Sequence, residues 1–203
     1  MPTPSIVVFD LGKVLLDFDY SIASRRIAAQ ANLTSAGVQQ FLDHSPLLYR
    51  FETGLMTQPE LFAEVQRHTG FRGSFEEFAG FFADIFWEIP PMIELHATLR
   101  RQGIPTYIFS NTNDLAIGHI RRSFPFYSNF NGYILSYEVK AMKPDPRIYE
   151  ALEKMSGKRG AEVLYLDDRQ ENVDAGAARG WQAILQTEPA KSRAVMKKHG
   201  LLG

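Results

Sequence analysis

The segment Ser5-Ile6-Val7-Val8-Phe9-Asp10-Leu11-Gly12 decides the fold, because it joins a short, β-branched apolar run to an aspartate. An apolar run of this length that ends at a polar residue is typical of a buried strand. Similar runs follow at 104–109, 133–135, 163–166 and 182–185, and helical patterns accompany them at 92–101, 115–123, 147–155 and 172–179. Strands that alternate with helices in this way predict a parallel sheet covered on both faces.

Residues 19–89 interrupt this alternation. Four or five helical patterns follow one another there without a strand, among them 21–31, 35–42, 58–69 and 75–86, and Pro90-Pro91 marks the exit. We therefore predict a doubly wound, Rossmann-like α/β core formed by residues 1–16 and 92–203. An all-helical cap domain is predicted to be inserted into it at 17–91.

The composition excludes several classes of protein. The 203 residues carry a formal net charge of -1. The chain therefore lacks the excess of basic residues that would indicate a nucleic-acid partner. The absence of cysteine excludes disulfides, zinc–thiolate sites and thiol nucleophiles, and it fits a reducing cytosol. We see no signal peptide, and no apolar stretch approaches the roughly 20 residues that span a bilayer. We expect a cytoplasmic protein without a membrane partner, either a monomer or a weak homodimer.

Polar and charged side chains follow three of the predicted strands, at the point where each strand ends. Asp10 follows the first strand, Ser110-Asn111 the strand at 104–109, and Asp167-Asp168 the strand at 163–166. Lys143-Pro144 lies in a loop before a helix. Because ligands of open parallel sheets bind beyond the carboxyl ends of the strands, these groups are predicted to converge on one edge.

Each of these residue types has a task in phosphoryl transfer. A carboxylate such as Asp10 can attack phosphorus and form an acyl phosphate, which splits the reaction into two steps. The attack brings two anions together, and a hard divalent cation held by carboxylates, usually Mg²⁺, offsets the repulsion. Lys143 would add a fixed positive charge and keep Asp10 ionised. Ser110 and the backbone N–H groups after it can grip phosphoryl oxygens, although Ser110 could instead cap the next helix.

The segment from Phe9 to Leu15 resembles the first motif of the haloacid dehalogenase superfamily. Ser110-Asn111 resembles its second motif, Lys143-Pro144 its third and Asp167-Asp168 its fourth, in the order and spacing of that superfamily. The helical insertion resembles the type 1 cap. Its segment Arg50-Phe51-Glu52-Thr53-Gly54 is similar to caps of bacterial sugar-phosphate phosphatases, and the phosphatase domain of soluble epoxide hydrolases is a similar relative.

The resemblance implies a role for each motif residue. Asp10 would be the nucleophile, with Lys143 and Ser110 as further catalytic residues. Ser110, Asn111 and Lys143 would bind the substrate. Magnesium would be held by four residues, with Asp168 as a direct ligand and Asp167 acting directly or through water: Asp10, the Gly12 carbonyl, Asp167 and Asp168. The implied reaction is hydrolysis of a small phosphate monoester, with a sugar phosphate as the leading substrate.

One position departs from the pattern of the superfamily. Most of its phosphatases carry a second aspartate two residues after the nucleophile, as general acid and base, and this chain has Gly12 there. A substrate whose leaving group needs little protonation is therefore expected, unless water or a cap residue supplies the proton. Arg50 and Glu52 could face the active site from the cap. Two alternatives stay open: a metal-free hydrolase of 2-haloacids, and a non-catalytic module that binds a phosphate ligand.

Overall fold

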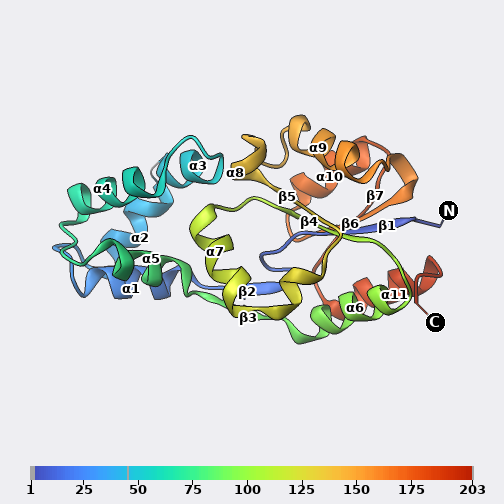
Figure 1. Ribbon diagram of the computed structural model, residues 1–203, viewed down its shortest axis with the longest axis horizontal. Helices are drawn as coiled ribbons and strands as arrows, with labels where there is room; N and C mark the ends of the chain where they lie inside the picture. Colours follow the sequence, from blue (N-terminus) through green and yellow to red (C-terminus); the bar gives the residue numbers. More distant parts are fainter. Residues whose placement is uncertain (1–2, 45, 203) are drawn as a thin grey trace.

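The computed structural model describes residues 3–44 and 46–202; for Asp43 and His44 it describes the backbone only. Its centre is a parallel sheet with the strand order β5-β4-β1-β6-β7 (Figure 1). These strands are β1 (Ile6–Phe9), β4 (Thr106–Ser110), β5 (Gly132–Leu135), β6 (Val163–Asp167) and β7 (Gln182–Leu185). Strand β1 lies in the middle, with Phe9 level with Ile108 on one side and Leu166 on the other. The predicted parallel sheet is thus confirmed.

The apolar run of β1 serves both faces of the sheet. Successive side chains of a strand point to opposite faces, so Val7 and Phe9 join one apolar cluster while Ile6 and Val8 join another. The first cluster is completed by α6 (Pro90–Arg101), α7 (Asp114–Ser123) and α11 (Pro189–Lys198). On the second face lie α9 (Pro146–Ser156) and α10 (Gln170–Ala178), drawn above the sheet in Figure 1. Helices on both faces define the predicted doubly wound architecture.

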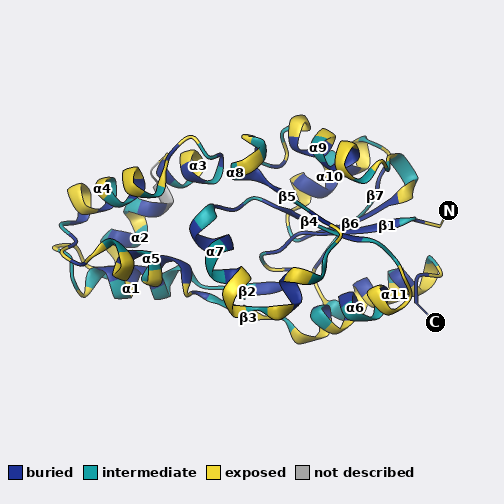
Figure 2. Ribbon diagram, viewed as in Figure 1, coloured by how far each residue is buried: buried dark blue, intermediate teal, exposed yellow. Residues whose placement is uncertain are grey.

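In the described part of the cap, five helices surround an apolar cluster that also takes in Leu115 of α7 (Figure 2). They are α1 (Tyr20–Ala28), α2 (Ser35–His44), α3 (Leu47–Glu52), α4 (Gln58–Thr69) and α5 (Phe75–Ala83). Phe51, Phe78 and Phe82 are buried in this core, where each contributes roughly 1.5–3 kcal/mol through burial. Capping boxes begin α4 and α5. The remaining short elements are η1 (Pro125–Asn129), α8 (Ser136–Val139) and η2 (Gly160–Glu162).

A two-stranded antiparallel ribbon joins the cap to the core. It pairs β2 (Leu16–Phe18) with β3 (Phe86–Glu88) and places Phe18 level with Phe86. The helix predicted for 75–86 was wrong at its end, because α5 stops at Ala83 and Phe86 belongs to the ribbon. A strand of three residues forms only by pairing with a distant segment, so its own sequence carries too little pattern to predict it.

Within residues 3–44 and 46–202, no helix has the length and apolar character needed to cross a bilayer.

Candidate active site

Asp10 lies directly beyond the carboxyl end of β1. Its backbone N–H donates to the Leu166 carbonyl at 2.9 Å, which continues the pairing with β6. The carboxylate oxygen Oδ1 accepts a hydrogen bond of 2.7 Å from the backbone N–H of Leu11. Only 8% of Asp10 is exposed. A central buried strand therefore holds this carboxylate in one place at the edge of the sheet.

The Lys143 ammonium joins two of the predicted site carboxylates. Its Nζ lies 3.0 Å from Asp10 Oδ1 and 2.6 Å from Asp167 Oδ2, and it donates to the Phe109 carbonyl at 2.8 Å. An ammonium has three N–H donors, so these contacts use all of them. Burial alone would lower the pKa of Lys143, but the Asp10 and Asp167 carboxylates raise it above its usual value. Lys143 is therefore a buried cation fixed by its partners.

Asn111 holds the backbone of Lys143. Its side-chain Nδ2 donates to the Lys143 carbonyl at 3.0 Å, and its Oδ1 accepts from the Lys143 N–H at 2.7 Å. The amide thus satisfies both backbone groups of the residue that carries the ammonium. Asn111 also lines the cavity described below, but its polar atoms are directed to the Lys143 loop. This geometry makes it a positioning residue, a task that the motif alone did not reveal.

The two aspartates that end β6 differ in their surroundings. Asp167 is fully buried, and its Oδ1 accepts hydrogen bonds from the Arg169 N–H and Asn172 Nδ2, both at 2.9 Å. Its Oδ2 accepts from Lys143 and from the Tyr165 hydroxyl. Burial alone would raise the pKa of Asp167, yet Lys143 and these hydrogen bonds lower it below its usual value. Both of its oxygens are already engaged by protein donors.

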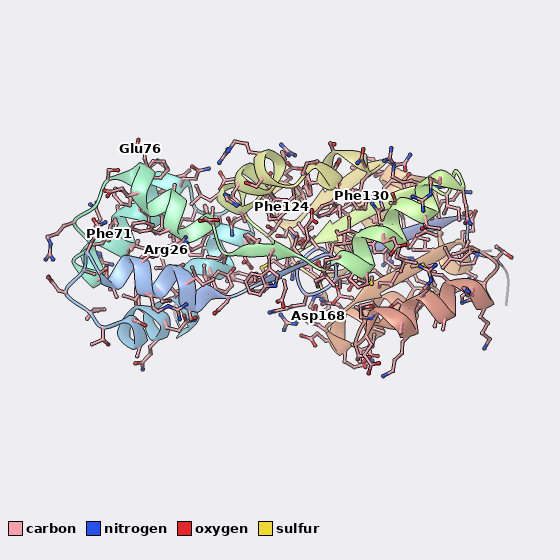
Figure 3. All side chains as sticks on the ribbon, turned by 90° about the horizontal axis from the view of Figure 1, so that it is seen from below. Arg26, Phe71, Glu76, Phe124, Phe130 and Asp168 are labelled. Carbon is pink, nitrogen blue, oxygen red and sulfur yellow. The ribbon has the colours of Figure 1, made fainter. Side chains whose placement is uncertain are left out.

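Asp168, in contrast, is half-buried and lines the cavity (Figure 3). Its carboxyl is close enough to that of Asp10 to share a hydrogen bond, and burial together with Asp167 raises its pKa. Burial also raises the pKa of Asp10 to about 7; Lys143 opposes this rise, while Asp167 and Asp168 reinforce it. The site therefore holds more negative charge than Lys143 compensates.

Carboxylate oxygens from Asp10, Asp167 and Asp168 lie within 4.8 Å of one another. Three hard oxygen donors at this spacing fit Mg²⁺, which binds proteins through one or two carboxylates and keeps part of its water shell. Asp10 and Asp168 are the two with hydrogen-bonding capacity to spare, because the oxygens of Asp167 are engaged. The residues present thus fit a divalent cation, with Asp167 placed to orient Lys143 beside it.

Gly12 has an aromatic neighbour in the place of a side chain. A Cβ atom added to Gly12 would lie 2.8 Å from Cε1 of Phe18, a ring that comes from β2. The backbone of Gly12 is outside the left-handed region, so only this ring hinders a larger residue. The Phe18 ring therefore occupies the space into which a side chain at position 12 would extend.

A cavity of about 210 Å³ connects these groups to the cap. The core contributes the predicted site residues Asp10, Gly12, Ser110, Asn111, Lys143 and Asp168 to its wall. The ribbon and the cap contribute the aromatic residues Phe18, Tyr20 and Phe86, together with Glu52 at the end of α3. Ser110 does not cap the following helix, because the Asn113 side chain accepts from the Ala116 N–H and caps α7. The Ser110 hydroxyl donates a long hydrogen bond of 3.4 Å to the Asn111 carbonyl.

Glu52 faces the cavity, whereas Arg50 is exposed and does not line it. The sequence left both residues open as cap groups near the site, and Glu52 alone is brought there. Burial raises the pKa of Glu52 to about 7, and the charge of Arg169 opposes this rise. Arg169 and Asn172, which follow β6, also line the cavity and had no signal in the sequence motifs.

This combination of a doubly wound core, a helical cap and a lysine between two strand-end aspartates defines a hydrolase of known type. The chain belongs to the haloacid dehalogenase-like hydrolase family, whose model matches residues 4–180. The resemblance drawn from the four motifs is thereby confirmed, and the protein is an enzyme of the hydrolase class.

Three known proteins illustrate the likeness. The chain is 26% identical over 184 residues to the sesquiterpene phosphatase astK of Aspergillus oryzae, with 89% of each chain covered. It is 25% identical over 189 residues to a D-ribitol-5-phosphate phosphatase of Bacteroides thetaiotaomicron, covering 88% of this chain and 89% of the relative. A haloacid dehalogenase-family enzyme of Bacteroides thetaiotaomicron, solved with magnesium and inorganic phosphate, superposes with a TM-score of 0.78 at 23% identity, covering 91% and 94% of the two chains.

Proposed function

We propose that this hydrolase is a magnesium-dependent phosphatase that cleaves a small phosphate monoester through an aspartyl-phosphate on Asp10. The observation that carries the proposal is the contact of Lys143 Nζ with both Asp10 and Asp167, next to the half-buried carboxyl of Asp168. Both curated relatives described above are phosphatases, which supports the same reaction class.

The proposed first step is attack of Asp10 on phosphorus. A bond forms between a carboxylate oxygen of Asp10 and phosphorus, while the bond from phosphorus to the leaving oxygen breaks. Lys143 and the Leu11 N–H both bind Oδ1 of Asp10, so the carboxylate reaches the phosphate in a fixed orientation. Ser110 is placed to donate to a phosphoryl oxygen. In the second step water attacks phosphorus, which releases phosphate and restores Asp10.

The proposed metal site consists of Asp10 and Asp168, with the Gly12 carbonyl and a contribution of Asp167 as further candidates. When bound, Mg²⁺ supplies positive charge that offsets the repulsion between the phosphate and the carboxylates. The solved relative that binds magnesium and phosphate supports this choice of cation. The pKa values of Asp10 and Asp168, raised by burial and further by neighbouring carboxylates, support it as well, because a bound cation would favour the ionised forms of both groups.

The proposed substrate is small, since the cavity measures about 210 Å³. A phosphorylated sugar or polyol is the leading candidate, on the strength of the ribitol-phosphate relative and of the cap segment around Glu52. Closure of the cap over the cavity would exclude water during the first step. The surplus of carboxylates argues against a metal-free 2-haloacid hydrolase, and the network that holds Lys143 argues against a module without turnover.

A single screen tests this proposal against its two alternatives. Phosphate esters and 2-haloacids are incubated with the protein, with and without Mg²⁺, and the release of phosphate and halide is measured. Phosphate release that requires Mg²⁺ is the expected result. Halide release without metal would overturn the proposal in favour of a dehalogenase, and the absence of both products would favour a binding module.

A further inference from the structure

The position that usually carries the general acid is closed in this protein. Gly12 has no side chain, and the Phe18 ring fills the space beside it. A leaving oxygen expelled without a proton becomes an alkoxide, and general acid catalysis is worth roughly 10²- to 10⁴-fold for such groups. Another donor that faces the same cavity would restore this contribution.

Most ionisable groups that line the cavity have other tasks. Lys143 uses its three N–H donors within the protein. The Lys13 ammonium is bound to the Asp17 carboxylate and to the Phe18 carbonyl. The Arg169 guanidinium pairs with Glu171. These cations can attract a phosphate, but none of them is suited to give up a proton.

Among the carboxyls of the cavity wall, Glu52 is the one that lies apart from the proposed metal site. Asp10 and Asp168 are close to each other and are the proposed ligands. Glu52 reaches the same cavity from the cap, as the last residue of α3. Attack by Asp10 proceeds in line, so the leaving oxygen departs on the side of phosphorus opposite Asp10. The placement of Glu52 therefore suits contact with the leaving group.

Two hydrogen bonds, one from Ser136 of α8 and one from Lys140 directly after this helix, fix the backbone around Glu52. The Ser136 hydroxyl lies 2.6 Å from the Glu52 carbonyl, and Lys140 Nζ donates to the Gly54 carbonyl at 2.7 Å. Ser136 also accepts from the Thr112 N–H, in the loop after β4. The segment that carries Glu52 is thus tied to the same loop region as Ser110 and Asn111.

The surroundings of Glu52 favour its neutral form. The side chain is half-buried and lies at the carboxyl end of α3, where the peptide dipoles disfavour a negative charge. Burial raises its pKa to about 7, and Arg169 is the charged group that opposes the rise. A carboxyl in this range can hold a proton near neutral pH and release it.

We propose that Glu52 is the general acid of the reaction, donating the proton of its carboxyl to the leaving oxygen. As the bond from Asp10 to phosphorus forms and the leaving bond breaks, the proton passes from Glu52 to the departing oxygen, which leaves as an alcohol. In the second step the Glu52 carboxylate takes a proton from the attacking water, and the cycle closes. The inference rests on the proposed phosphatase function and replaces the expectation drawn from Gly12 alone.

Leaving-group dependence tests this assignment. Single-turnover phosphorylation rates are measured for the wild type and for Glu52→Gln, with a series from dinitrophenyl phosphate to alkyl phosphates. Glu52→Gln is expected to slow alkyl phosphates by roughly 10²- to 10⁴-fold and to leave dinitrophenyl phosphate nearly unchanged, because that leaving group needs no proton. The wild type should show a shallow slope against leaving-group pKa, and the variant a steep one.

Glu138→Gln serves as the matched control, because Glu138 is exposed on α8 and does not line the cavity. Glu52→Asp keeps the acid on a shorter side chain and should retain more of the alkyl rate than Glu52→Gln. Equal losses across the series, or no loss, would overturn the role of Glu52 while leaving the phosphatase proposal intact. A wild type that hydrolyses none of these esters with Mg²⁺ would overturn both.

Discussion

Replacement of Lys143 by methionine removes the ammonium and keeps a side chain of similar length. The Lys143 side chain is 1% exposed, and its loss leaves Asp10, Asp167 and the Phe109 carbonyl without their shared donor. Breaking a buried ion pair by removal of one partner costs about 3–5 kcal/mol, because the remaining charge is buried without compensation. We expect a loss of this size in the free energy of unfolding at pH 8, together with loss of phosphatase activity.

The pH dependence of this loss has a definite sign. In the wild type the pKa of Asp167 is lowered, so its contribution to stability is present above the pKa of the unfolded chain and is lost as the pH falls through the folded value. In Lys143→Met the folded pKa of Asp167 would rise above the unfolded value, and the variant would lose stability as the pH rises. The difference between the two proteins should therefore be smaller at pH 5 than at pH 8.

Urea denaturation in the presence of a chelator measures this difference, since a bound cation could replace the lost ammonium. Lys158→Met is a suitable control, because Lys158 forms an exposed ion pair with Glu162 and its loss should matter far less. A free energy of unfolding for Lys143→Met within about 1 kcal/mol of the wild type at pH 8 would refute the reasoning, since a buried unpaired carboxylate costs several times as much.

Three further predictions concern neighbouring groups. Gly12→Asp should lower the free energy of unfolding by about 1–3 kcal/mol through overpacking against Phe18, and adding Phe18→Ala should recover much of this loss. If urea denaturation gives Gly12→Asp the same stability with and without Phe18→Ala, the contact is contradicted. Mg²⁺ should raise the melting temperature of the wild type, because it binds the folded state, and Asp168→Asn should reduce that increase; an unchanged increase in calorimetry would remove Asp168 from the metal site. Asn111→Ala should cost about 1–3 kcal/mol and lower kcat, since it leaves the buried N–H of Lys143 unpaired; wild-type stability and rate would show that the loop holds its shape unaided.

The sequence predicted the core and the place of the site because both depend on local patterns. Each strand of the sheet is a short apolar run, and three of the strands are followed by polar or charged site residues, such as Asp10 and Asp167. Parallel strands bring such ends to one edge without further information. That rule does not cover Lys143, because Lys143 lies in the loop between α8 and α9, and its contact with Asp10 is seen only in the folded chain.

The features that the sequence did not reveal depend on contacts between distant segments. The β2–β3 ribbon needs Leu16–Phe18 and Phe86–Glu88 to meet, and neither segment indicates the other. Phe18 beside Gly12 follows from that pairing. The separate tasks of Asp167 and Asp168 depend on which oxygens find protein donors in the folded chain. The predicted cytoplasmic location and the monomer or weak homodimer stay predictions.

Mass spectrometry of the acid-quenched enzyme after a single turnover tests the central claim most directly. With Mg²⁺ and a phosphate ester, the peptide that contains Asp10 should carry a phosphoryl group that hydroxylamine removes. Asp10→Asn should carry none and should lose kcat by about 10³-fold or more, as expected for loss of a nucleophile. A phosphoryl group on another residue, or more than a tenth of the wild-type rate in Asp10→Asn, would contradict the assignment of Asp10.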